Sequence, residues 1–256
     1  MSMGAGHAHP LYLDRASPIH RLPPEVKIVA SVAYTVVVVI TSRDAFWAFG
    51  CYALLILGVA ALARIPPGWL ASRALIEVPF VVFALLLPLV GGGERVTWLG
   101  LSLSVEGLLG AWNILIKGTL GVVSSLVLAA TTPARDLIIG LDRLRCPAVI
   151  IQIATFMLRY TAVLVDEARR MRIARLSRGY NPRFLWQARA LAAGVGSLFL
   201  RSYERGERVY LAMLSRGYTG RMPRLDTGGA SAAQWASALT LPVAAALVAA
   251  TALLQG

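Results

Sequence analysis

The pentapeptide Leu-Ser-Arg-Gly-Tyr occurs twice in the chain, at residues 176–180 and again at residues 214–218. The same offset relates three further upstream residues of each copy, namely Asp166, Arg170 and Ala174 with Glu204, Arg208 and Ala212. Glycine directly after a helix permits the left-handed turn that ends it, so serine and arginine then lie on the last turn. A guanidinium has five donors and binds carboxylate or phosphate in bidentate fashion, and tyrosine often carries binding energy at interfaces. Each copy therefore predicts a compact binding element at the end of a helix.

The candidate interaction residues fall into two groups. The contact group consists of the two Ser-Arg-Gly triplets, Ser177, Arg178, Gly179, Ser215, Arg216 and Gly217, and the anchoring group consists of Tyr180 and Tyr218. In a simpler interpretation the arginines only balance helix dipoles or contact lipid headgroups, and the glycines act as caps. Neither role needs a fixed set of neighbouring residues. The identical copies therefore favour binding, and two identical binding elements indicate two identical or homologous partner subunits.

The composition indicates the class of protein that carries these elements. Hydrophobic residues make up 57% of the 256 residues and charged residues only 15%, whereas soluble domains carry about 25% charged residues. The net charge of +12 could suggest a nucleic-acid-binding protein, but such a domain has no use for so much apolar surface. The composition therefore predicts an all-α integral membrane protein with no nucleic-acid partner.

A helix needs roughly 20 mostly apolar residues to cross a bilayer. Five segments meet this requirement, and we predict transmembrane helices at residues 26–42, 45–63, 74–90, 107–132 and 232–254. Two other uncharged runs, at residues 146–158 and 190–200, are too short to cross comfortably. We expect these two runs to lie at the membrane surface or beneath the bundle.

The distribution of arginine predicts the orientation. Residues 131–224 contain 17 arginines and six acidic residues, which gives this segment a net charge of +11. Because cytoplasmic segments carry the excess of positive charge, we expect this segment and the N-terminus to be cytoplasmic and the C-terminus to lie outside. The predicted organisation is a cytoplasmic segment at 1–25, four spans within 26–132, a cytoplasmic coupling domain at 133–231 and a final span within 232–256.

Two long helices form the core of the predicted cytoplasmic domain. Pro147 can open a helix that runs to Ser177, and Pro182 can open another that runs to about Ser215. Thirty helical residues extend over about 45 Å. The predicted domain thus consists of two rigid helices, each of which ends in the repeated Ser-Arg-Gly motif.

Several features argue against catalysis or metal binding by this chain. It has no G-x-x-x-x-G-K-[ST] phosphate loop and no His/Cys cluster, so we expect no enzyme activity, no bound cofactor and no metal site. Cys51 and Cys146 give neither a disulfide framework nor metal-ligand spacing. His7 and His9 stand two apart near the N-terminus, but two imidazoles on a terminal tail form a weak site at best.

Besides Lys27 near the start of the first predicted span, two ionisable residues, Glu77 and Lys117, fall within predicted membrane segments. Ionisable residues inside a membrane are by default suspected of function. A structural role accounts for both residues equally well. Each side chain would either pair with a group inside the protein or extend from the membrane interior to its interface.

The chain resembles a known family in three places. These are the opening stretch "SPIHRLPPEVKI", the "TTP" at 131–133 and the paired Arg-Gly motifs after long helices. Together they resemble the transmembrane T component of energy-coupling-factor (ECF) transporters, most nearly the cobalt type, CbiQ. The resemblance covers nearly the whole chain. It departs mildly from the family pattern, because the motifs here read Ser-Arg-Gly where the family often has Ala-Arg-Gly.

The resemblance implies a function and a set of partners. It implies that Arg178 and Arg216 seat in grooves on two ABC-type ATPase subunits, which bind the ATP and Mg²⁺. Identical motifs would suit an ATPase homodimer. The chain would couple this dimer to a small membrane subunit that binds the substrate, most simply cobalt, although nickel or a vitamin remains open. The expected location is the bacterial inner membrane.

Two other classes of function remain as alternatives. A self-contained secondary transporter should show inverted repeats in its membrane halves, whereas the repeat here lies in the arginine-rich insert. A basic membrane-anchored protein that binds lipid or nucleic acid should show scattered lysines and arginines with interleaved aromatic residues. In this segment the positive charge is all arginine and is placed on two predicted helices.

Overall fold

The computed structural model describes residues 11–90, 92, 95–98, 101–180, 189–220 and 228–255. The helices are α1 Pro24–Ile40, α2 Phe46–Leu62, α3 Pro67–Ala74, the 3₁₀ turn η1 Leu75–Glu77, α4 Val78–Val90, α5 Val105–Thr131, α6 Ala134–Arg143, α7 Ala148–Ser177, α8 Arg189–Leu214 and α9 Ala232–Gln255. The predicted all-α class is confirmed. A short antiparallel pair, β1 Arg95–Trp98 and β2 Leu101–Ser104, was not predicted.

The described residues form two compact units. The first, here called the bundle, comprises Ala8–Leu144 and Gly229–Gly256 and contains α1–α6 and α9. The second, here called the α7–α8 unit, comprises Arg145–Gly228. The predicted insert began at residue 133, but α6 packs on α1 and belongs to the bundle. The start of the second long helix, predicted at Pro182, lies outside the described residues.

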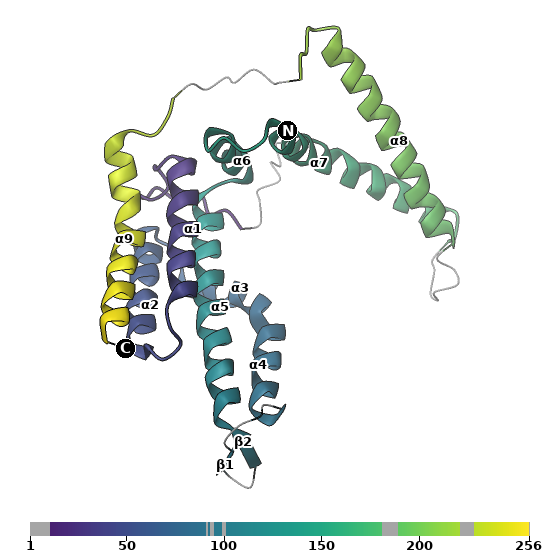
Figure 1. Ribbon diagram of the computed structural model, residues 1–256. Helices are drawn as coiled ribbons and strands as arrows, with labels where there is room; N and C mark the ends of the chain where they lie inside the picture. The colour runs from purple at the N-terminus through teal and green to yellow at the C-terminus, as the bar shows by residue number, and fades with distance from the viewer. Residues whose placement is uncertain are drawn as a thin grey trace. The chain divides into compact units, whose positions relative to one another are not determined.

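The bundle is built around α1, α2, α5 and α9, which run alongside one another, with α4 packed against α5 (Figure 1). Tyr34, Phe49 and Tyr52 are fully buried between α1, α2 and their neighbours. The Tyr34 hydroxyl donates to the Tyr52 carbonyl at 2.9 Å, and the Thr41 and Tyr52 hydroxyls lie 2.8 Å apart. These contacts satisfy the buried polar atoms, which would otherwise be costly in an apolar interior.

Among the residues that the structure describes, four helical segments are long and apolar enough to cross a membrane, namely Pro67–Leu89, Val105–Thr131, Ala148–Ser177 and Ala232–Leu254. The predicted spans at 26–42 and 45–63 correspond to α1 and α2, which have 17 residues each. Large apolar side chains are exposed around the bundle, among them Ile40, Leu54 and Ile76, each at least 72% exposed. Such exposure fits a surface that faces lipid. The chain is a multi-pass membrane protein.

The segment Ala148–Ser177, which is α7, was not among the predicted spans. The first part of α7 is apolar enough to cross a membrane, because Arg159 is the one charged residue between 148 and 165. Its last part, residues 166–177, carries six charged residues. No residue of α7 is buried within the chain. The helix is therefore apolar at its start and strongly charged at its end.

Helices α4 and α5 approach closely where α5 begins. The Ser104 hydroxyl caps α5 by accepting from the Gly107 amide at 3.0 Å. A Cβ atom added at Gly107 would lie 2.5 Å from the Leu87 carbonyl oxygen and 2.8 Å from the Pro88 Cα. Glycine at this position lets the two backbones touch.

We therefore expect Gly107→Ala to push α4 away from α5 and to destabilise the bundle by about 1–3 kcal/mol, the usual cost of overpacking. Gly110→Ala is the matched control, since its Cβ would meet only the Leu87 Cδ1 at 4.0 Å. The measurement is thermal unfolding of the detergent-solubilised chain. Equal melting temperatures for the two variants would contradict the close contact.

Candidate functional site: two helix ends of the α7–α8 unit

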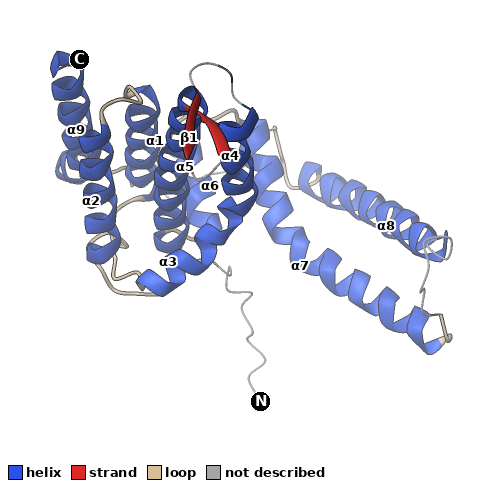
Figure 2. Ribbon diagram, turned by 90° about the horizontal axis from the view of Figure 1, so that it is seen from below, coloured by secondary structure: helices blue, strands red, loops and turns tan. Residues whose placement is uncertain are grey.

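Helices α7 and α8 run side by side in opposite directions (Figure 2). Their contacts follow an antiparallel register, in which Gly194 faces Met171, and Arg201 forms an ion pair with Glu167. This orientation places the end of α8 beside the start of α7.

The two repeated pentapeptides fold identically. In the first, the Tyr180 amide donates to the Arg175 carbonyl at 3.1 Å and the Gly179 amide donates to the Leu176 carbonyl at 2.9 Å. In the second, the Tyr218 and Gly217 amides donate to the Met213 and Leu214 carbonyls, both at 3.0 Å. Gly179 and Gly217 have φ angles of +72° and +80°. These hydrogen bonds define a Schellman motif, in which a glycine in the left-handed region ends the helix.

Arg178 and Arg216 occupy the same position of this motif, the last residue before the left-handed glycine. Both arginines are exposed, as are Ser177 and Ser215. The Ser177 hydroxyl donates to the Ile173 carbonyl and the Ser215 hydroxyl to the Ala212 carbonyl, each at 3.0 Å. Here residues 176–180 and 214–218 are called the helix tips. The repeated sequence thus gives two exposed guanidinium groups on two identical backbones.

The two tyrosines have different surroundings. The Tyr218 hydroxyl donates to the Gln152 Oε1 at 2.6 Å, and the Gln152 amide donates to the Gly220 carbonyl at 2.7 Å. Tyr218 therefore fastens the second tip to the first turns of α7, a role inside the chain that was not predicted. Tyr180 is half-buried at the first tip. The prediction that both tyrosines anchor a partner stays a prediction.

The antiparallel register separates the tips. Tyr218 contacts Gln152 at one end of α7, whereas Arg178 lies 26 residues further along the same helix. At 1.5 Å per residue the two tips are about 40 Å apart. One partner pocket of ordinary size cannot receive both tips. The structure is therefore suited to two separate binding sites.

Sequence reasoning missed the acidic residue that joins the two helices. Asp166 and Arg170 stand four residues apart in the first repeat, which is the spacing of a helical ion pair, but Glu167 forms the ion pairs, with Arg170 at 3.1 Å and with Arg201 on α8. Hydrogen bonds from Arg201 and Arg170 hold the pKa of the Glu167 carboxyl below its ordinary value. In the second repeat the pattern holds, since Glu204 lies 3.8 Å from Arg208.

In the bundle, the other two segments that resemble the family meet each other. The Lys27 ammonium, in the opening stretch, donates to the Thr131 carbonyl at the end of α5 at 2.9 Å. The Leu13 amide donates to the Ala130 carbonyl at 3.0 Å, and one nitrogen of the His20 ring lies 3.0 Å from the Leu13 carbonyl oxygen. A cation at a helix C-terminus meets the negative end of the helix dipole. These contacts fix the N-terminal stretch against the end of α5.

The two ionisable residues predicted within membrane segments differ. The Lys117 ammonium donates to the Val39 carbonyl of α1 at 2.7 Å, which is a structural pairing as expected. Glu77 is 6% exposed, and its Oε1 has no hydrogen-bond partner among the described residues. The same oxygen lies where a side chain at Gly118 would be, 2.6 Å from its Cβ position. Gly118 therefore makes room for the carboxyl group against α5.

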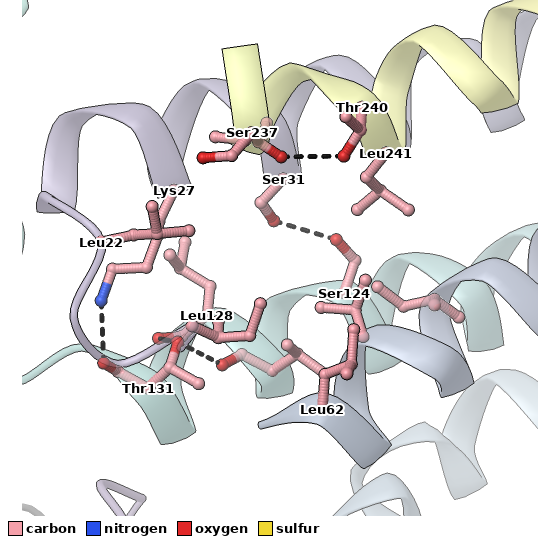
Figure 3. Close-up of a pocket in the computed structure, with 16 residues that line it drawn as sticks. Leu22, Lys27, Ser31, Leu62, Ser124, Leu128, Thr131, Ser237, Thr240 and Leu241 are labelled. Atoms are coloured by element: carbon pink, nitrogen blue, oxygen red, sulfur yellow. Dashed lines mark hydrogen bonds between the residues drawn. The ribbon is translucent and has the colours of Figure 1, made fainter. Parts of the chain in front are cut away.

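The bundle contains a cavity of about 190 Å³ between α1, α2, α5 and α9 (Figure 3). Its walls are mostly apolar, with hydroxyls from Ser31 and Ser124, which lie 2.9 Å apart, and with Lys27 at one end. Hydroxyls and an ammonium group do not suit a divalent transition metal, which prefers imidazole, thiolate or carboxylate. No group of three or more His, Cys, Asp or Glu that could hold a metal occurs among the described residues. His7 and His9 lie outside them.

Comparison with known proteins places the chain in a family. A family model described as "Cobalt transport protein", CbiQ, matches residues 15–225. The chain belongs to this family. The match includes both helix tips, the opening stretch and the Thr-Thr-Pro segment, so the resemblance inferred from the sequence is confirmed.

Curated relatives agree with this assignment. The chain is 32% identical over 193 residues to "Cobalt transport protein CbiQ" of Rhodobacter capsulatus, covering 75% of this chain and 77% of the relative. It is 29% identical over 223 residues to "Energy-coupling factor transporter transmembrane protein EcfT" of Bacillus selenitireducens, covering 82% of each chain. A second EcfT, from Thermosediminibacter oceani, is 26% identical over 222 residues, covering 82% of this chain and 83% of the relative. The family is thus one of transmembrane transporter components.

The tips depend on glycine, which gives a test of their geometry. Because Gly217 has a φ angle of +80°, Gly217→Ala should strain the second tip by about 1–2 kcal/mol. We expect faster hydrogen exchange at residues 213–218 of the full-length chain. Gly206→Ala, in the interior of α8 with open space around it, should leave exchange at the tip unchanged. Unchanged exchange in Gly217→Ala would contradict the motif described here.

Proposed function

We propose that this chain is the membrane coupling subunit of an ATP-driven ECF-type uptake transporter. In this proposal each helix tip seats in a groove on one subunit of an ABC-type ATPase dimer. The α7–α8 unit passes the motion of the ATPases to the membrane and to a separate substrate-binding subunit. ATP and Mg²⁺ bind to the ATPase, and the chain is not an enzyme.

The observation that carries this proposal is the pair of identical tips about 40 Å apart. Arg178 and Arg216 are exposed on the same backbone motif. Identical geometry at two separated points supports two partners of identical shape, and an ATPase homodimer has such a pair of surfaces. A salt-dependent contact with lipid headgroups needs charge but not two identical backbones.

The remaining surface of the α7–α8 unit supports a partner in the membrane. Large apolar side chains are exposed along both helices, among them Ile150, Ile153 and Met157 on α7 and Phe199 and Leu200 on α8. Exposed apolar surface of this extent marks a contact with protein or lipid. We assign this surface to the substrate-binding subunit and the adjoining lipid.

We propose cobalt as the cargo, on the family description and the name of the relative from Rhodobacter capsulatus. The cavity in the bundle does not suit a metal ion, because the ammonium of Lys27 lies at its end. We therefore assign cargo binding to the separate subunit. The proposed location is the bacterial inner membrane, with the N-terminus and the α7–α8 unit on its cytoplasmic side, as the positive charge of that unit favours.

The first test removes the guanidinium groups. We expect Arg178→Ala or Arg216→Ala alone to weaken ATPase binding by about 2–5 kcal/mol, because a buried acceptor on the ATPase loses its partner. The double variant should lose the ATPase altogether, and lysine should restore little because it lacks the bidentate fork. Co-purification of the ATPase and uptake of radioactive cobalt into vesicles are the measurements.

Arg172→Ala is the matched control for this test, since Arg172 is exposed on α7 before the first tip. It should retain the ATPase at the wild-type level. If the double variant also retains it, the tips have another purpose. If Arg172→Ala weakens ATPase binding as much as Arg178→Ala or Arg216→Ala does, the general positive charge of the helix binds the ATPase.

A second test concerns the placement of α7, which is long enough to cross a membrane. In our proposal it does not cross, so its two ends lie on the same side. In a variant with Cys51→Ala, the native Cys146 should react with an impermeant thiol reagent only after the membrane is opened. A cysteine introduced as Arg172→Cys, in a chain with Cys51→Ala and Cys146→Ala, should behave in the same way. Labelling of one position from outside and the other from inside would show that α7 crosses the membrane.

A further inference from the structure

The carboxylate of Glu25, in the first turn of α1, holds two distant parts of the bundle. The Arg143 guanidinium donates to both carboxylate oxygens at 3.0 Å, and the Ala230 amide donates to Oε1 at 3.0 Å. The Glu25 side chain is only 4% exposed. Hydrogen bonds to a buried charged group are strong, and removal of this one carboxylate breaks all three at once.

Arg143 and Ala230 lie next to the two connections between the bundle and the α7–α8 unit. The bundle ends at Leu144, where the chain leaves for the α7–α8 unit, and resumes at Gly229. Arg143 precedes the point of departure by one residue, and Ala230 follows the point of return by one residue. Both connections of the α7–α8 unit are therefore fastened to one side chain.

The backbone around Glu25 is itself held firmly. A Cβ atom added at Gly140 of α6 would lie 3.0 Å from the Glu25 amide nitrogen, so α6 and α1 touch at this point. The next residue, Val26, is fully buried and packs with Ala238 of α9. Lys27 then binds the end of α5. A displacement at the Glu25 carboxylate thus reaches α1, α6, α9 and α5 within three residues.

We propose that Glu25 is the joint through which the α7–α8 unit acts on the membrane bundle. This inference rests on the proposed function. Motion received at either tip arrives at the bundle through one of the two connections, and both connections end on the same carboxylate. Glu25 is a positioning residue, because it touches neither ATP nor cargo. Without it the ATPases still bind and hydrolyse ATP, but their motion no longer moves α1.

The first experiment measures coupling in the complete transporter, reconstituted in liposomes with its ATPase and substrate-binding subunit. Glu25→Gln keeps an acceptor for the Ala230 amide but cannot form the ion pair with Arg143. We expect co-purification of the ATPase and ATP hydrolysis to stay within twofold of wild type. Uptake of radioactive cobalt per ATP hydrolysed should fall at least tenfold, and Arg143→Gln and the double variant should give the same loss.

The control is Glu106→Gln, the same substitution at an exposed acid in the first turn of α5. It should leave uptake per ATP unchanged. If Glu25→Gln reduces ATP hydrolysis and cobalt uptake equally, so that uptake per ATP hydrolysed is unchanged, the proposed role of Glu25 is wrong. If the wild-type chain fails to bind the ATPase or to support cobalt uptake, the proposed function is wrong instead.

The second experiment uses the full-length chain alone in lipid nanodiscs and does not depend on the ATPase. In Glu25→Ala, which removes both the ion pair with Arg143 and the acceptor for the Ala230 amide, amide hydrogen exchange should rise at least fivefold at residues 141–146 and at residues 228–232 together. Glu106→Ala should change neither region. A rise at only one connection, or at neither, would show that the two connections are not held by one carboxylate.

Discussion

The antiparallel packing of α7 and α8 is the constraint on which the rest of this account depends. Each helix ends in the same Schellman motif, and glycine at +72° or +80° stops each helix with its arginine exposed. Parallel helices would bring the two arginines to one place. The observed register, set by Gly194 against Met171 and by the pairing of Glu167 with Arg201, separates them by the length of α7 instead. The repeated motif is thereby presented at two separate points of the α7–α8 unit.

The bundle meets a different requirement. Polar groups buried in an apolar environment must find partners within the protein. In the bundle many of these partners gather around the first turn of α1, where Glu25 and Lys27 bind Arg143, the Ala230 amide and the Thr131 carbonyl. Elsewhere α4 and α5 approach through glycine, and large apolar side chains face outward. The buried ion pair of Glu25 with Arg143 thus lies beside the connections to the α7–α8 unit.

The sequence predicted the helical class, the family and the ends of α7 and α8, because each of these depends on local patterns. Glycine after a periodic segment ends a helix wherever it occurs, so Gly179 and Gly217 could be assigned directly. Contacts between distant residues could not be predicted in this way. Glu25 and Arg143 are 118 positions apart, and nothing in the neighbourhood of either residue indicates the other. The pairing of Glu167 with Arg201 depends on the rotation of α7 against α8, which the spacing of residues along one helix does not fix.

The central claim is that the two tips bind the same site on two copies of one ATPase. Site-specific photo-crosslinking tests it most directly, with a photoreactive amino acid placed at Ser177 in one variant and at Ser215 in another. The cross-linked peptides are then identified by mass spectrometry of the assembled complex. We expect the same ATPase peptide from both positions. Cross-links to different proteins, to unrelated regions of the ATPase or to lipid alone would contradict it.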